Sequence, residues 1–192
     1  MKRLAFIDAN VLAKPFTRTM IVVGAAQEDA DYKVTWSAYA EAEGNRHLRA
    51  QAKTLDVFRA ERGLSMSPTG GDADRYTATE RKDRQILADA VAADARWLIT
   101  ENVPDFGWDD LRATGITAIH YDLFLAEHLS VEAYRQAISI LGHGKVSAES
   151  VHAHVALLHP RLFAVMADAF PGVEPVQSEH CRPREMVRDP KI

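Results

Sequence analysis

The chain has 192 residues, of which 47% are hydrophobic and 26% are charged, a composition typical of an ordinary soluble protein with one main domain. Its net charge of -4 argues against a protein that holds nucleic acid mainly through bulk positive potential, but it allows contact with phosphate through bound cations. The single cysteine, Cys181, excludes an intramolecular disulfide. No apolar run approaches the roughly 18 residues of a membrane span and no signal-peptide pattern is present, so we expect a cytoplasmic protein with no membrane contact.

Four short apolar runs, each followed by polar residues, predict β-strands. They cover residues 4–7, 34–36, 97–99 and 116–119. Helical stretches cover residues 20–30, 38–62, 82–94 and 122–128. Short apolar strands that alternate with helices predict an α/β fold, a parallel-sheet sandwich with helices on both faces. In such sheets, ligands bind beyond the carboxyl ends of the strands.

Polar side chains follow three of the predicted strands. Asp8 ends the first, Ser37 follows the second as a predicted helix cap, and the third is followed by Thr100, Asn102 and Asp105. Because parallel strands end at the same edge of the sheet, we expect these residues to lie at one rim.

The predicted helix 82–94 carries two acids with different surroundings. At about 100° per residue, one stripe is apolar, formed by Ile86, Leu87, Ala90 and Val91. Asp83 projects into this stripe and Asp89 falls on the opposite side, so Asp89 is expected on the solvated surface. A buried charge is costly unless it is paired or binds a metal, which makes Asp83 a candidate ligand. The alternative is an acid that stabilises the N-terminus of the helix.

The predicted helix 38–62 carries two glutamates, Glu41 and Glu43, about 160° apart around its axis. Glu43 lies one helical turn from Tyr39 and one turn from Arg46, on the same face of the helix. Periodicity favours Glu43 as the inward-facing acid only if the Tyr39 row is the buried one.

A cluster of carboxylates at an open sheet edge is unstable by itself, because like charges raise one another's pKa values. A divalent cation removes this conflict, and Mg²⁺ prefers oxygen ligands without a histidine or cysteine cage. The pattern therefore predicts Mg²⁺ or Mn²⁺ as a cofactor for hydrolysis of phosphodiester bonds.

Three segments in order resemble the PIN domain family, the fold of VapC-type toxin ribonucleases, in its branch with a DANVL start and a TxNxxDF loop. They are FIDANVL at 6–12, VTWSAYAEAEGNRHL at 34–48 and KDRQILADAVAADARWLITENVPDF at 82–106. The resemblance spans roughly the first 125 residues. It implies an endoribonuclease that is the toxin of a toxin-antitoxin pair, with RNA as substrate, a cognate antitoxin protein as partner and a homodimeric assembly.

The resemblance also assigns roles to individual residues. It implies Asp8, Glu43 and Asp83 as catalytic acids and metal ligands, and so selects Glu43 over Glu41. Many members carry an aspartate where this chain has Asn102, which leaves open whether Asp105 is a fourth ligand or only shapes its loop. The supporting polar residues are Asn10, Ser37, Thr100 and Asn102. Arg46 and Arg84 are the candidates for contact with RNA phosphates.

Other functions fit the sequence less well. A haloacid-dehalogenase-type phosphatase needs a general acid where Asn10 stands. A receiver domain needs adjacent acids after the first strand and a late strand ending in lysine, and neither is present. A catalytically silent PIN-like scaffold that binds RNA or protein is the remaining alternative, which metal titration distinguishes. The scattered histidines favour surface or core positions over a zinc site.

The remaining third of the chain is predicted to be helical. We expect a nuclease domain over residues 1–128, a helical extension over 129–170 that begins after a Ser130 cap, and a loosely ordered tail over 171–192.

Overall fold

The computed structural model describes residues 2–176 and 186–190. Its central sheet has the strand order β2-β1-β3-β4-β5. The strands are β1 (Arg3–Ile7), β2 (Tyr32–Thr35), β3 (Trp97–Thr100), β4 (Thr117–His120) and β5 (Val187–Arg188). The first four strands pair in parallel, and β5 runs antiparallel to β4. Residue Ala5 of β1 lies between Val34 of β2 and Trp97 of β3, so the ends of these strands meet at one edge.

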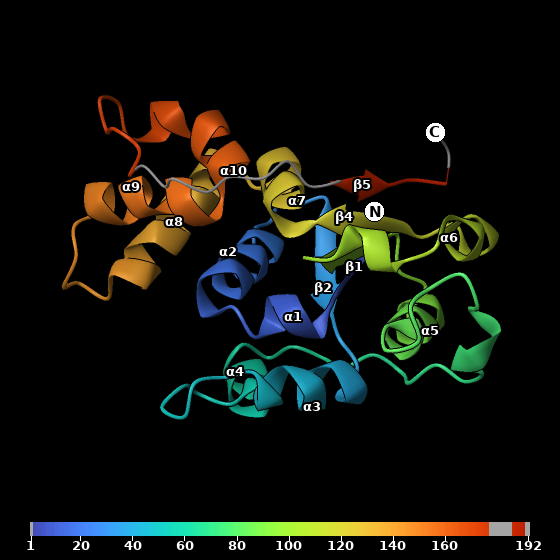
Figure 1. Cartoon of the computed structure of the whole chain (residues 1–192). Coiled ribbons are helices and arrows are strands. Elements are labelled where there is room, and N and C mark those ends of the chain that lie inside the picture. The colour runs from blue at the N-terminus through green and yellow to red at the C-terminus, as the bar shows by residue number, and fades with distance from the viewer. Residues whose placement is uncertain (1, 177–185, 191–192) are drawn as a thin grey trace.

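The predicted α/β class and its parallel sheet are confirmed. Consecutive residues of the central strands, such as Phe6 with Ile7 and Leu98 with Ile99, are fully buried. Continuous burial of this kind requires layers on both faces of a sheet. Figure 1 shows α2, α7 and α8 on one side and α5 and α6 on the other.

The helices of the first 128 residues alternate with the strands. They are α1 (Ala9–Leu12), α2 (Pro15–Ala25), α3 (Ala38–Arg46), α4 (Leu55–Glu61), α5 (Arg84–Ala92), α6 (Trp108–Thr114) and α7 (Tyr121–His128), with short 3-10 helices η1 (Ala73–Arg75) and η2 (Val103–Asp105). The prediction of a helix over 20–30 placed α2 several residues too late in the chain. Among the described helices, none combines the length and the apolar character needed to cross a membrane.

The prediction of one helix over 38–62 is wrong, because the chain leaves the helix after Arg46 and re-enters it at Leu55. The Asn45 side chain accepts a hydrogen bond of 2.8 Å from the Leu55 amide, which holds the start of α4 against α3. At Gly44, an added Cβ would lie 2.7 Å from the Leu55 side chain and 3.2 Å from the Ala9 carbonyl oxygen. The absence of a side chain there allows α3 to approach both α1 and α4.

The helices of the C-terminal third pack onto the same core. They are α8 (Val131–Gly142), α9 (Ala148–Leu158), α10 (Pro160–Val165) and η3 (Ala167–Ala169). The predicted Ser130 cap is confirmed, since its hydroxyl accepts from the Ala133 amide. Asp122 of α7 accepts hydrogen bonds from the Arg161 and Leu162 amides at the start of α10. The domain division at residue 128 stays a prediction.

Strand β5 was not predicted from the sequence. The Met186 carbonyl oxygen accepts from the His120 amide at 2.7 Å, and Arg188 Nη1 donates to the Phe106 carbonyl oxygen at 2.7 Å. These contacts tie residues 186–188 to β4 and to the end of η2. Residues 177–185 and 191–192 of the predicted tail lie outside the described residues.

Candidate active site

Asp8 lies in a hydrogen-bond network that joins the ends of β1 and β3. Its Oδ2 atom accepts from Asn10 Nδ2 at 2.8 Å and from Thr100 Oγ1 at 2.7 Å. The Asn10 Oδ1 atom accepts in turn from the Glu101 amide, and Thr100 Oγ1 accepts from the Asn102 amide. The side chain of Asp8 is therefore fixed in orientation, with only 3% of the residue exposed.

The surroundings of Asp8 favour its protonated form. Burial raises the pKa of Asp8 to about 6, against the opposing effect of the hydrogen bonds from Thr100, the Ala9 amide and Asn10. The carboxylate of Glu43 raises this pKa further. Asp8 and Glu43 therefore lie close enough to interact, although they come from different elements.

Asp83 lies at the N-terminus of α5 but does not cap it, since its side chain makes no capping hydrogen bond. The Oδ2 atom is buried and accepts no hydrogen bond, and the side chain is only 16% exposed. Burial, followed by the charge of Asp8, raises the pKa of Asp83 to about 7; Asp105 and Glu80 add to the effect, and Lys82 opposes it. Asp83 is thus a carboxylate with a buried oxygen that accepts no hydrogen bond and has only an ion-pair contact with Lys82, at 3.8 Å.

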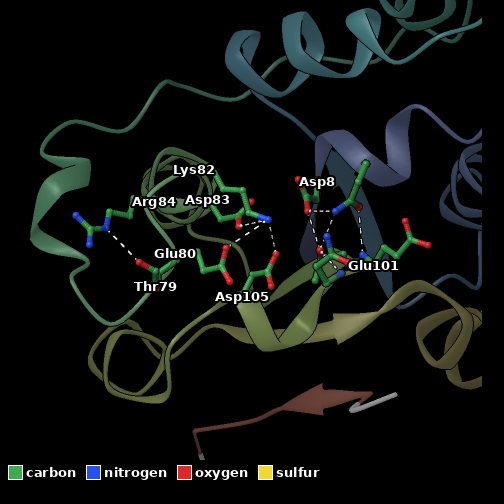
Figure 2. A network of polar contacts seen from close by, with 11 residues as sticks. Asp8, Thr79, Glu80, Lys82, Asp83, Arg84, Glu101 and Asp105 are labelled. Atoms are coloured by element: carbon green, nitrogen blue, oxygen red, sulfur yellow. Dashed lines mark hydrogen bonds and ion pairs between the residues drawn. The ribbon is translucent and has the colours of Figure 1, made fainter. Parts of the chain in front are cut away.

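Asp83 belongs to a compact acidic group with Glu80 and Asp105, whose ligand oxygens all lie within 4.8 Å of one another. The backbone helps to hold this group, because the Glu80 amide donates to the Asp105 carbonyl oxygen at 2.8 Å. Lys82 Nζ lies among the acids, and Figure 2 shows Asp8 nearby, beyond this ammonium group. We refer to Glu80, Asp83 and Asp105 as the acidic triad.

The turn that presents the triad is anchored to the start of α6. The Thr79 amide donates to Asp110 Oδ2 at 2.7 Å, and the Thr79 hydroxyl accepts from the Gly107 amide at 3.2 Å. A Cβ at Gly107 would lie 2.4 Å from backbone atoms of Ala78, so this approach requires glycine. These contacts place Glu80 opposite Asp105.

Helix α3 supplies the remaining predicted acid. The predicted Ser37 cap is confirmed by a bond of 3.1 Å from the Ala40 amide. Glu41 is buried and accepts from Trp36 Nε1 and Arg59 Nε, both at 2.8 Å, which gives it a structural role. Glu43 is half-buried and forms no hydrogen bond or ion pair with the residues that the structure describes.

The structure brings together four of the predicted site residues, but not equally tightly. Asp83 and Asp105 lie in the acidic triad, whereas Asp8 and Glu43 are not part of it. The charge of Asp8 raises the pKa of Asp83, and the charge of Glu43 raises the pKa of Asp8. The position of Asp105 beside Asp83 shows that the loop after β3 returns to the rim. Asn102 is exposed next to this loop.

Sequence reasoning missed Glu80, Lys82 and Tyr39. The first two precede α5 in a turn whose direction depends on distant contacts, so helical periodicity carries no information about them. Tyr39 is 37% exposed on α3. Burial and then the charge of Glu43 raise the pKa of Tyr39, with smaller contributions from Asp83 and Asp89 in the same direction and an opposing one from Arg46. The phenol group of Tyr39 is therefore subject to the charges of these acids.

The predicted contact between Arg84 and RNA gains no support from the geometry. Arg84 donates to the carbonyl oxygens of Thr79 and Thr77, at 3.1 and 3.3 Å, and its side chain points away from Asp8 in Figure 2. It therefore stabilises the 77–79 loop. Arg46, in contrast, is exposed on the same helix as Glu43.

The expectation that Asp89 is solvated is wrong. Asp89 is fully buried, and its Oδ1 atom accepts from the Gly70 amide and from Gln85 Nε2, both at 2.7 Å. The loop around Gly70 covers the face of α5 that the helical pattern assigned to solvent.

The histidines do not form a metal site among the described residues. His152 is buried and hydrogen-bonded to the Tyr134 hydroxyl, and His159 is buried against Thr17. Among the described residues, the acidic triad is the only group of side chains that could hold a metal ion.

The donor set of the triad suits a hard divalent cation. All of its ligand atoms are carboxylate oxygens, which is the chemistry of Mg²⁺ or Mn²⁺ sites. The buried Oδ2 atom of Asp83 has no hydrogen-bond donor, and a cation would satisfy it. Comparison of the chain with family models, curated proteins and solved structures returns no match.

Proposed function

We propose that this protein is a PIN-type endoribonuclease that hydrolyses RNA phosphodiester bonds with Mg²⁺ or Mn²⁺. The observation that carries the proposal is the buried Oδ2 atom of Asp83, which accepts no hydrogen bond, in a triad of acids next to Asp8 at the carboxyl edge of a parallel sheet. Ligand sites of open α/β sheets lie at this edge.

The acids divide into three roles. Asp83, Asp105 and Glu80 would hold the cation, which supplies an attacking water of lowered pKa and neutralises charge at the scissile phosphate. Asp8, fixed by Asn10 and Thr100, adds negative charge beside the triad. Glu43 has no described partner, so its carboxylate is free to accept a proton from the attacking water.

Substrate contact is proposed on α3. Tyr39 has an exposed ring on the same helix as Glu43, and such a ring suits stacking on an unpaired base, the usual mode of recognition for single-stranded RNA. Arg46 is exposed on the same helix and suits a phosphate. The net charge of -4 fits a nuclease that reaches the backbone through a cation and a few side chains.

A toxin role, a cognate antitoxin and a homodimer follow from the resemblance of the three segments to VapC-type nucleases. These remain proposals. The neighbouring reading frame tests the antitoxin, and sedimentation of the purified chain tests the homodimer.

The test is RNA cleavage by purified protein with Mg²⁺ or Mn²⁺, followed by chelation. We expect cleavage that stops in EDTA, is abolished by Asp8→Asn and Asp83→Asn, and is unchanged by Glu132→Gln, an exposed acid on α8. Cleavage that persists in EDTA and in Asp8→Asn would refute the proposal.

One observation favours a second candidate, the silent scaffold. Lys82 already neutralises part of the acidic triad, so the cluster has a counter-charge without any metal. A scaffold would bind RNA or protein without cleaving RNA and would show no saturable Mn²⁺ binding.

A further inference from the structure

The ammonium group of Lys82 occupies the middle of the acidic triad. Its Nζ atom lies 2.9 Å from Asp105 Oδ2, 3.4 Å from Glu80 Oε2 and 3.8 Å from Asp83 Oδ2. Figure 2 shows these contacts converging on one nitrogen atom. One cation thus touches all three acids at the place where a divalent cation would bind.

The electrostatics of these contacts are mutual. The hydrogen bond to Asp105, together with the charges of Asp83 and Asp105, raises the pKa of Lys82 above its ordinary value. In return, Lys82 lowers the pKa of Asp83, against the effect of burial. The ammonium group therefore offsets repulsion among the triad when no metal is bound.

The side chain of Lys82 can leave the acidic triad easily. Its side chain is 61% exposed, whereas those of Asp83 and Asp105 are 16% and 17% exposed. The lysine can leave toward solvent without disturbing the core, but the two aspartates cannot follow it. Because the ammonium group itself is exposed to water, its ion pairs with the triad are weakened, and a divalent cation can displace it.

We propose that Lys82 is a tethered cation that competes with the divalent metal for the acidic triad. Its ammonium group holds the three carboxylates together in the metal-free protein and must leave for Mg²⁺ or Mn²⁺ to bind. This inference rests on the metal site of the proposed function and adds that the chain itself limits the affinity of that site.

The experiment measures Mn²⁺ binding by calorimetry and by electron paramagnetic resonance, without RNA. We expect Lys82→Met to lower the dissociation constant of Mn²⁺ by about tenfold, because the competing charge is gone. Lys82→Gln should act in the same direction. The metal-free melting temperature of both variants should fall, and the increase in melting temperature on Mn²⁺ addition should exceed that of the unmodified protein.

The matched control is Arg81→Met, which removes one positive charge from the preceding, exposed residue. Arg81 makes no ion pair with the described residues, so its removal should change the dissociation constant by less than about twofold. An equal effect of the two variants would overturn the competition, because general charge would then explain both.

The possible failures are distinguishable. Equal Mn²⁺ affinity in the unmodified protein and Lys82→Met overturns the role of Lys82 but leaves the proposed metal site. Absence of Mn²⁺ binding in both overturns the two proposals together. Tighter binding in Lys82→Met without any RNA cleavage supports the tethered cation and refutes only the nuclease.

Discussion

Two acids of one segment, Asp83 and Asp89, are both removed from water and yet have different energetic roles. Asp89 accepts from Gly70 and Gln85, so its burial stabilises the loop over α5. The Oδ2 atoms of both residues are buried and accept no hydrogen bond, but among the described residues Asp83 also has no hydrogen-bond donor for its other carboxylate oxygen. An unsatisfied buried carboxylate of this kind lowers the stability of the folded protein. A protein retains such a group when the group has a function.

A pH-dependent prediction follows for Asp83. Its pKa of about 7 in the folded protein lies above the ordinary 3.8. The folded state then binds more protons than the unfolded state between these values. The contribution of Asp83 to stability is fully present below pH 3.8 and is lost as the pH rises through about 7.

The substitution Asp83→Asn should remove this loss of stability at higher pH, because asparagine does not ionise. In EDTA, the melting temperature of the variant should exceed that of the unmodified protein increasingly as the pH rises from about 5 to about 8. In the presence of Mn²⁺, the melting temperature of the variant should instead be lower than that of the unmodified protein. The control, Asp109→Asn, removes an exposed first-turn acid of α6 and should cost a few tenths to about 1 kcal/mol at both pH values. Asp83→Asn behaving like this control would show that Asp83 serves only the helix.

At the scale of elements, the loop after β3 determines how many acids reach the rim. Asp105 lies beside Asp83 because η2 turns back from Asn102, whose carbonyl oxygen accepts from the Asp105 amide. Pro104 restricts the backbone within this turn. The loop geometry thus brings Asp105 back to the rim, next to Asp83.

We predict that Asp105→Asn lowers RNA cleavage substantially and weakens Mn²⁺ binding, but less than Asp8→Asn. Asn102→Asp should be tolerated and should tighten Mn²⁺ binding, because it adds a charge to an exposed position at the rim. Cleavage rates at saturating Mn²⁺ are the measurement. A rate for Asp105→Asn equal to that of the unmodified protein would mean that Asp105 only shapes the loop.

The sequence allowed prediction of the elements whose signal is local. Continuous apolar runs located the four parallel strands, and Ser37 and Ser130 were found as caps. The break after Arg46 was not predictable, because it depends on a side-chain contact from Asn45 to Leu55. Glu80 and Lys82 were missed for a similar reason, since their turn is directed by Thr79 and its bond to Asp110.

At the scale of the whole molecule, segments distant in sequence support the site. Strand β5 pairs with β4, and Arg188 donates to the carbonyl oxygen of Phe106, the residue after Asp105. The C-terminal helices pack on α2 and α7, on the other side of the sheet from α5. The acidic triad is therefore held by residues from position 79 to position 188.

Deletion of residues 186–192 should lower the melting temperature by on the order of 5 °C, since β4 loses its antiparallel partner β5 and keeps only β3. It should also weaken Mn²⁺ binding, because the end of η2 loses the bond from Arg188. Deletion of residues 191–192 alone is the control and should leave β5 intact. Unchanged Mn²⁺ affinity after the longer deletion would show that η2 holds Asp105 without help.

The bond from Arg188 to Phe106 has a consequence for the order in which the protein is made. A ribosome delivers the chain from the N-terminus, so Asp8, Glu43, Asp83 and Asp105 emerge long before Arg188. The loop that carries Asp105 gains this hydrogen bond only after residue 188 has been synthesised. A nascent chain that has not yet reached residue 188 therefore has its acids but not this support, which delays full assembly of the site until Arg188 has been synthesised.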